Sequence, residues 1–483
     1  MKRNITVILL LVSMLTAGCS FSRSYEKPKP PIPAAWPTGA VYSPKLGDEA
    51  AAGAADLHWS AFWQDERLQW LIETALGNNR DLRLAALNVE KARALYGIQR
   101  SELFPSIGAT GGMTRQRIPQ DLSSSKKPTT QSQYSVNLGI ASWEIDFFGR
   151  IRSLEEQALE VYLASEEARN SAQIAVVATV ASAYLSLIAD REMLTLARST
   201  LETQKALFDL IQSRMDAGLG TEIDVQRAKS QVDVAQADVL RYTQQVAKDE
   251  NALDLIVGQT VDRDLLAERL SGVKPPRSVA PGLSSEVLLL RPDIQAAEHR
   301  LLAANAQINA ARAALFPRIS LTTGFGTASA ELSGLFGAGS ATWLFSPQIV
   351  APIFDARLWS AYDAAQIERE LAVAQYEKAI QAAFREVADV LAVRGTIGDQ
   401  LQTQKSLIQS VEKTYNLSET RYVQGLDSYL GVLDAQRSLY SARQGLVQLQ
   451  LSDLLNQVQL YAVLGGGKDR TSDRLTPSLS QKD

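Results

Sequence analysis

The sequence predicts an internally duplicated α+β chain, with four β-strands and long helices of the coiled-coil type. Two stretches, Asp81–Pro105 and Asp293–Pro317, lie 212 residues apart, and each is an apolar-periodic helical run that ends in Leu-Phe-Pro. A second match recurs at a spacing of 207, where Arg214-x-x-x-Gly218 and Arg421-x-x-x-Gly425 each precede a long helical pattern. Self-similarity at a fixed spacing indicates one supersecondary unit used twice rather than two unrelated domains.

The amino terminus has the features of an export signal. Two basic residues precede an apolar run from Ile5 to Leu15 that is too short to span a bilayer, so residues 1–18 are predicted to be a signal peptide. Cys19 follows small residues, in a motif that resembles a bacterial lipobox, and is expected to be lipidated. Ser20 follows it, and by resemblance to other bacterial lipoproteins the absence of Asp at this position favours sorting to the outer membrane. Thr16 stands where such motifs usually hold leucine, so an incidental cysteine in an ordinary signal is the alternative. Residues 19–57 are rich in proline and predict an extended lipidated segment.

Composition excludes several kinds of partner and site. The net charge is -4 and the charges are dispersed, so no nucleic-acid partner is expected. Cys19 is the only cysteine of the 483 residues, which excludes a disulfide framework and a Cys-based metal site. We find no run of about 18 or more apolar residues after the signal, so no transmembrane helix is expected. A chain that crosses a membrane without one must do so as a closed β-barrel.

Strands are predicted where apolar residues alternate with small or polar ones. The alternation is clearest over residues 134–141 and 319–326, and weaker over 107–118 and 343–353. These segments form two hairpins, at about 106–147 and 318–354, with loops near 119–133 and 330–342. Apolar-out alternation at this length is typical of transmembrane barrel strands, although a soluble sandwich gives the same pattern. Four strands cannot close a barrel around a useful pore, so several chains would have to share one.

Two unusually long helices are predicted over residues 150–217 and 357–422, the second interrupted midway by Gly395 and Gly398. Each is followed by a helix whose apolar residues are spaced alternately three and four apart, starting at Val225 and at Val432, which is a coiled-coil seam. Each copy therefore yields an antiparallel helical hairpin that turns at the glycine of its Arg-x-x-x-Gly motif.

The duplication sets the predicted domain boundaries. Repeat 1 covers residues 58–270 and repeat 2 covers residues 271–466, and a polar tail over residues 467–483 follows. Each repeat is expected to supply a helix, a β-hairpin and a long helical hairpin.

Several short motifs occur in a fixed order along the chain: the lipobox, the Leu-Phe-Pro helix ends and residues 143–150, 376–379, 421–425 and 433–438. Together they resemble the outer membrane factors of tripartite efflux pumps, the TolC-like family, in its OprM-type lipoprotein branch. The resemblance covers essentially the whole mature chain. It implies an α+β membrane protein that forms a homotrimer. Twelve strands, four from each chain, would close one β-barrel in the outer membrane lipid, and the helices would form a periplasmic tunnel.

The same resemblance implies the partners and the activity. A periplasmic adaptor (membrane fusion) protein and an inner membrane RND-type transporter would deliver substrate to a passive exit duct for drugs or other small molecules. No cofactor is implied beyond the lipid on Cys19, and no enzyme activity is expected. The exported substrate cannot be read from the sequence.

A periplasmic gate is implied at the second hairpin turn, where Leu430 and Asp434 match the family's constriction. They lie one helical turn apart and so on one helix face. Three copies of each would form an apolar ring, which excludes water, and a carboxylate ring, which favours cations. Ordinary packing for Leu430 and ordinary solvation for Asp434 form the alternative. Four polar residues near the turns are candidates for contacts that lock the gate: Tyr422, Arg437, Asp224 and Glu222.

Other candidate sites are weak. His58 and His299 are the only histidines and have no metal-ligand spacing. Gly465–Gly467 follows the last helix and indicates a helix stop rather than a phosphate loop. Glutamate pairs such as Glu155-Glu156 lie within long helices, where a solvated face is the expected role. The rival functions are a structural coiled-coil envelope lipoprotein without a pore and an envelope hydrolase, for which no catalytic motif is present.

Overall fold

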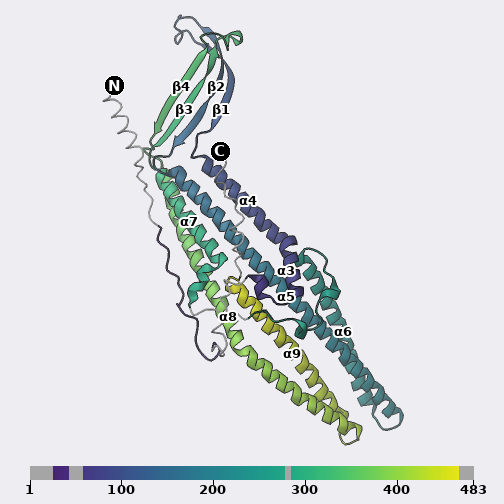
Figure 1. Cartoon of the computed structure of the whole chain (residues 1–483). Coiled ribbons are helices and arrows are strands. Elements are labelled where there is room, and N and C mark those ends of the chain that lie inside the picture. The colour runs from purple at the N-terminus through teal and green to yellow at the C-terminus, as the bar shows by residue number, and fades with distance from the viewer. Residues whose placement is uncertain (1–24, 43–57, 278–283, 467–483) are drawn as a thin grey trace. The chain divides into compact units, whose positions relative to one another are not determined.

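The computed structural model describes residues 25–42, 58–277 and 284–466, so the predicted signal peptide, Cys19 and the polar tail lie outside the described residues. Helices and strands follow one another in two similar series (Figure 1). The first series is α2 (Trp59–Phe62), α3 (Glu66–Asn78), α4 (Arg80–Ser101), β1 (Ile107–Ile118), β2 (Thr129–Ile145), α5 (Arg150–Asp216) and α6 (Glu222–Val257). The second is α7 (Pro292–Ala313), β3 (Arg318–Ser329), β4 (Ala341–Val350), α8 (Ala356–Val423) and α9 (Tyr429–Val463). The predicted order of a helix, two strands and two long helices in each copy is confirmed.

The four strands form one antiparallel sheet in the order β1-β2-β3-β4. One row across the sheet is apolar, and its members in register are Ala109, Leu138, Phe325 and Trp343. The next row is small or polar: Thr110, Asn137, Gly326 and Thr342. Successive residues of a strand point to opposite faces, so one face of the sheet is apolar and the other is not. This confirms the predicted alternation.

Two details of the sheet differ from the prediction or were not foreseen. β2 begins at Thr129, so the first loop is shorter than predicted, because the polar residues 129–133 pair with β1. The pairing of β2 with β3 shifts between Ile140 and Trp143, where Ser142 has φ 56°. One extra residue in a strand is a β-bulge, which bends the strand and increases its local twist.

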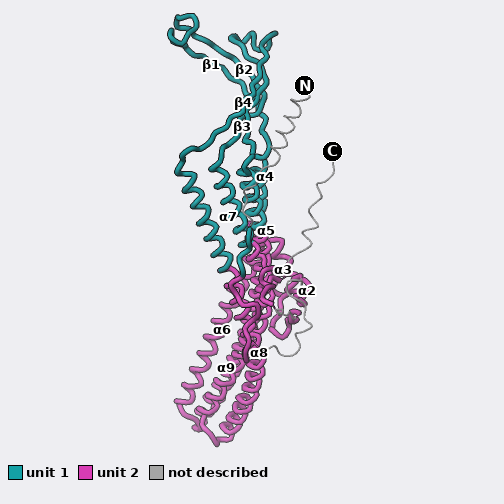
Figure 2. The backbone as a smooth tube through the Cα atoms, turned by 90° about the vertical axis from the view of Figure 1, so that its left-hand side faces the viewer, with its two compact units in different colours: residues 1–29, 88–166, 296–377 teal, residues 30–87, 167–295, 378–483 magenta. Residues whose placement is uncertain are grey.

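The chain forms two compact units, and each takes segments from both copies (Figure 2). Unit 1 contains the sheet, within residues 88–166 and 296–377. Unit 2 contains the hairpin turns, within residues 30–87, 167–295 and 378–483. The compact units therefore do not coincide with the repeats, because the long helices of each copy continue from one unit into the other.

One helix passes a compositional test for a membrane span that the search for apolar runs did not meet. Helix α5 contains an 18-residue window of mean hydropathy 1.8 with at most two charged residues, long and apolar enough to cross a membrane by composition. A search for strictly apolar runs misses this window, because the window contains Ser and Thr residues as well as apolar ones. Half of the window is buried within the chain, and Val180, Tyr184 and Ile188 are each 0% exposed. The window therefore contributes to the core of unit 2, and the absence of a transmembrane helix stays a prediction.

The long hairpins turn where the sequence predicts. Gly218 and Gly425 both have φ 74°, a conformation that glycine adopts without strain. Leu219 donates its backbone N–H to the Arg214 carbonyl at 2.8 Å, and the second copy repeats this bond between Leu426 and Arg421 at 2.9 Å. These are Schellman helix ends, which satisfy the last carbonyls of α5 and α8.

The predicted interruption of α8 is wrong, because α8 runs unbroken for 68 residues through Gly395 and Gly398. Gly395 instead provides space for the amino-terminal segment: a Cβ on it would lie 1.7 Å from the Val41 carbonyl oxygen. Nearby, Trp36 stacks on Phe384 with ring centroids 5.3 Å apart. The described part of the predicted extended segment is thus packed against α8.

Candidate functional site: the helical hairpin tips

A buried cluster joins the two helical hairpins close to their turns. Its members come from α5, α6, α8 and α9: Leu207, Ile211, Val225, Ala228, Tyr422, Tyr429, Val432 and Leu433. Val225, Ala228 and Val432 belong to the predicted seams, so the seams do pack between helices as expected. At roughly 25 cal/mol per Å² of buried apolar surface, such a cluster holds the hairpins together more strongly than surface polar contacts do.

Helices α6 and α9 lie side by side in parallel. Three hydrogen bonds between them join residues 206, 202 and 202 positions apart, close to the repeat spacing. These bonds run from Arg437 Nε to Gln231 Oε1 at 3.1 Å, from Tyr440 Oη to Asp238 Oδ2 at 3.0 Å and from Gln444 Nε2 to Tyr242 Oη at 3.2 Å. Equivalent residues of the two copies are therefore nearly level with each other.

The predicted gate residues lie on the exposed face of α9. Leu430 is 52% exposed and Asp434 is exposed as well, whereas Val432 and Leu433 between them are 0% and 4% exposed. The Asp434 backbone carbonyl accepts a hydrogen bond from Ser438 Oγ at 3.0 Å. An exposed leucine and an exposed aspartate on one face are thus available for contacts outside the chain.

Two of the predicted locking residues are occupied inside the chain. Tyr422 is 8% exposed, and the Arg214 guanidinium lies over its ring, 5.0 Å from the centroid. Burial raises the pKa of Tyr422, an effect that Arg214 opposes and Asp224 reinforces. Arg437 makes the bond to Gln231 described above. Gln231 is only 7% exposed, and nothing in the residue types pointed to it as the partner.

The other two locking residues make local contacts at the start of α6. Asp224 accepts a hydrogen bond from Thr221 Oγ1 at 2.7 Å, and Thr221 also caps the helix. Glu222 accepts one from Gln226 Nε2 at 2.7 Å. Within the described residues, no hydrogen bond or ion pair joins either carboxylate to Tyr422 or Arg437. A role for the four in locking the gate between chains stays a prediction.

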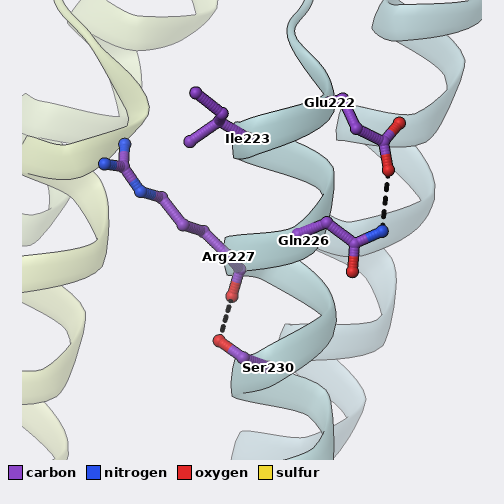
Figure 3. Close-up of a pocket in the computed structure, with 5 residues that line it drawn as sticks. All are labelled: Glu222, Ile223, Gln226, Arg227 and Ser230. Carbon is purple, nitrogen blue, oxygen red and sulfur yellow. Dashed lines mark hydrogen bonds between the residues drawn. The ribbon is translucent and has the colours of Figure 1, made fainter.

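An open hollow lies on the same part of α6, lined by Glu222, Ile223, Gln226, Arg227 and Ser230. Figure 3 shows Ile223 and Arg227 extending to one side of the helix, toward the neighbouring hairpin, and Glu222 and Gln226 to the other. Ligand sites are usually enclosed and mostly apolar, with a few converging polar groups. This hollow is open rather than enclosed, so it is better interpreted as the free surface of the tip.

The remaining polar candidates make structural contacts. His58 caps α2, and His299 Nδ1 lies 2.6 Å from Glu160 Oε2. Gly465, with φ 76°, ends α9 as predicted, while Gly467 lies outside the described residues. Across residues 25–42, 58–277 and 284–466 there is no group of three His, Cys, Asp or Glu side chains that could hold a metal ion.

Sequence reasoning missed one carboxyl pair, Asp190 on α5 and Asp249 on α6. Burial and the neighbouring Asp249 carboxyl raise the pKa of Asp190 to about 7. Gln245 Nε2 donates to Asp249 at 2.8 Å, and the other Asp249 oxygen is buried. The only signal in the sequence was an aspartate placed directly after the apolar window of α5.

Comparison with known proteins agrees with this architecture. The sequence model of the family described as outer membrane efflux protein matches residues 71–259 and 283–466, one segment for each copy. The toluene efflux pump outer membrane protein TtgF of Pseudomonas putida is 47% identical over 470 residues, which cover 96% of this chain and 97% of that protein. Outer membrane protein OprJ of Pseudomonas aeruginosa is 41% identical over 466 residues and 96% of each chain.

A solved structure shares the fold as well. The crystal structure of the open state of the MtrE outer membrane channel of Neisseria gonorrhoeae matches with a TM-score of 0.82 and 35% identity. The match covers 93% of this chain and 98% of that one. The duplicated helical hairpins, the four-stranded sheet and these likenesses lead to one conclusion: this chain belongs to the outer membrane efflux protein family.

Proposed function

We propose that this outer membrane protein is the exit duct of a tripartite efflux system, assembled as a homotrimer and closed at rest by Leu430 and Asp434. An adaptor protein and an inner membrane RND-type transporter supply the connection and the energy. The duct catalyses no reaction. Cys19 carries the lipid that anchors each chain.

The sheet is the observation that carries this proposal. Its outer strands, β1 and β4, each leave one row of backbone N–H and C=O groups unpaired within the chain. Its apolar face presents Phe325, Trp343 and Ile349, which are 68%, 76% and 69% exposed. A bilayer offers an apolar surface but no backbone partners, so the two edges must pair with other chains. Pairing β1 of one chain with β4 of the next closes a barrel.

Exposed apolar residues on the helices support a contact between copies. On α4 they follow a helical spacing: Leu84, Leu87, Leu95 and Ile98, which are 59%, 49%, 53% and 63% exposed. On α8, Trp359, Ile367 and Leu371 are 59%, 56% and 51% exposed. No residue of α4 is buried within the chain, which is unusual for a 22-residue helix. In a trimer, these faces cover one another.

The two turns of each chain suit docking of an adaptor. Leu219 and Leu426 directly follow the turn glycines and are 71% and 62% exposed. In the trimer this places six exposed leucines at the hairpin ends. An adaptor with apolar tips of its own could bury them, and the free energy gained is then available to move the hairpins.

The names of the relatives suggest the cargo. TtgF is a toluene efflux pump protein, so we propose that this duct also passes small apolar organic molecules. A wide passive duct need not recognise its cargo, and the choice of substrate then lies with the pump. Deletion of the gene should make cells more sensitive to toluene, and unchanged sensitivity would argue against this cargo.

The channel is tested by conductance in planar lipid bilayers. Purified protein should migrate as a heat-modifiable trimer and give a small conductance that rises in Leu430→Ala/Asp434→Ala. Leu407→Ala is the matched control, because Leu407 is a comparably exposed leucine (46%) on α8 that precedes the turn glycine Gly425 by 18 residues. The rival function, a coiled-coil lipoprotein without a pore, predicts no conductance from any variant. Unchanged conductance in the gate variant alone would remove the gate but leave the duct.

A further inference from the structure

The first copy places its own pair of side chains beside the gate. Ile223 and Arg227 precede Leu430 and Asp434 by the repeat spacing of 207. They too lie one turn apart on the exposed face of their helix, where Ile223 is 63% exposed and the Arg227 side chain 45%. Where the second copy has a leucine and an acid, the first therefore has an isoleucine and a base.

The contact between α6 and α9 puts the two pairs at one level. The bond between Gln231 and Arg437 joins residues four positions after Arg227 and three positions after Asp434. Because one residue of an α-helix rises about 1.5 Å, Arg227 and Asp434 lie within a few ångströms of the same height. Both are near the amino-terminal ends of helices that run in parallel.

Neither charge is neutralised well inside the chain. The nearest carboxylate to Arg227 is that of Asp224, at 3.7 Å, and Asp224 also accepts the Thr221 hydroxyl at 2.7 Å. A guanidinium has five N–H donors, so this single long contact leaves most of them available. In Figure 3 the Arg227 side chain extends from α6 toward the neighbouring hairpin. Within the described residues, the Asp434 carboxylate has no ion pair.

We propose that Arg227 is the counter-charge of Asp434 at the aperture. This rests on the trimeric channel proposed above. Hairpins of the first and second copy alternate around the trimer axis, so three arginines alternate with three aspartates, and each carboxylate lies between two guanidinium groups. The ring is formally neutral. Arg227 thus determines ion selectivity at rest, opposing the cation preference of a ring of aspartates alone.

Ion selectivity is the direct readout. A unit charge about 7 Å from an ion changes the local concentration of that ion roughly threefold in a water-like dielectric, before screening by salt. Arg227→Ala should therefore raise the potassium-to-chloride permeability ratio about threefold or more, measured from the zero-current potential in a KCl gradient. Asp434→Ala should lower the ratio by a similar factor, and the double variant should return it close to wild type.

Lys229→Ala is the matched control, because it removes the same charge two residues away on the opposite side of α6, where Lys229 is exposed. It should leave the ratio unchanged. The exchanged variant Arg227→Asp/Asp434→Arg should keep the wild-type ratio, since it preserves the alternating ring. An unchanged ratio in Arg227→Ala, or an equal shift in Lys229→Ala, would overturn the proposal. If one of these contradicting results is found while conductance still rises in Leu430→Ala/Asp434→Ala, the proposal for Arg227 fails and the proposed gate does not.

Discussion

Tyr429 is the first residue of α9 and lies at the centre of the cluster that joins the two hairpins. It is 1% exposed, and its ring lies 5.6 Å from that of Tyr422. Its hydroxyl is buried and has no hydrogen-bond partner among the residues that the structure describes. Burial raises the pKa of Tyr429 to about 12, because the apolar surroundings disfavour the phenolate. The substitution Tyr429→Phe removes only this oxygen.

The magnitude follows from two opposing effects. A buried polar group without a partner costs about 1–3 kcal/mol, and Phe removes that cost. The cavity left by one oxygen, on the order of 10–15 Å³, costs about 0.3 kcal/mol at roughly 24 cal/mol per Å³. The net stabilisation is about 0.7–2.7 kcal/mol. Tyr440→Phe, on the same helix, should have the opposite effect, since the Tyr440 hydroxyl donates to the Asp238 carboxylate at 3.0 Å. Hydrogen bonds to charged groups are worth about 1.5–3 kcal/mol.

Hydrogen exchange of the hairpin amides is the suitable assay, because a chain of this length gains only about 1 °C in Tm per kcal/mol. Backbone amides of residues 418–436 in detergent-solubilised protein should exchange about 3–100-fold more slowly in Tyr429→Phe. Those around Tyr440 should exchange faster in Tyr440→Phe. Equal or faster exchange in Tyr429→Phe would show that the hydroxyl has a partner, and the reasoning would fail.

Three further substitutions test other parts of unit 2. Gly395→Ala should displace the amino-terminal segment, because its Cβ would lie 1.7 Å from the Val41 carbonyl oxygen; faster exchange of the amides of residues 33–42 would show this. The raised pKa of Asp190, about 7, means that the folded chain holds a proton that the unfolded chain releases near pH 4, so stability falls as pH rises from about 4 to 7. Asp190→Asn should flatten that slope in urea unfolding. Arg291 is 8% exposed and bonds Asp293 at 2.7 Å, Glu386 at 3.0 Å and the Val463 carbonyl at 2.8 Å. Arg291→Met should cost about 3 kcal/mol, and an unchanged urea midpoint would contradict this.

Most of the fold could be predicted from the spacing of apolar residues, because the helical and strand periods reflect which face of an element is buried. Local packing and backbone geometry determine the coiled-coil seams that start at Val225 and Val432 and the turns at Gly218 and Gly425. Both properties can be inferred from the types of the residues at these positions. The same reliance on residue type led to the wrong prediction that Gly395 interrupts α8. A glycine within a helix costs only about 1 kcal/mol, which the packing of a 68-residue helix easily offsets. The bulge at Ser142 depends on pairing with β3, which no local pattern contains.

The candidate site was less predictable from residue type alone. Leu430 and Asp434 were selected by resemblance to a family, and their exposure on α9 is compatible with the gate but does not distinguish it from an ordinary solvated surface. The partner of Arg437 could not be foreseen, since Gln231 is one of many glutamines and only the register of α6 against α9 brings it within 3.1 Å. The register between two helices is a property of the assembled core, and it cannot be predicted from the sequence of either helix alone.

The duplication explains where the two copies must agree and where they can differ. Seam residues pack in the core between the helices, and the turn glycines adopt the backbone conformation that both turns require. A substitution at either kind of position therefore destabilises the copy in which it occurs. Exposed positions carry no such cost within the chain, and there the copies have diverged, from Ile223 and Arg227 to Leu430 and Asp434. In the proposed trimer, that difference would give a sixfold scaffold with threefold chemistry. Opposite charges at equivalent positions would attract around the proposed aperture, whereas six identical charges would repel one another, so divergence of the exposed face would favour the closed state.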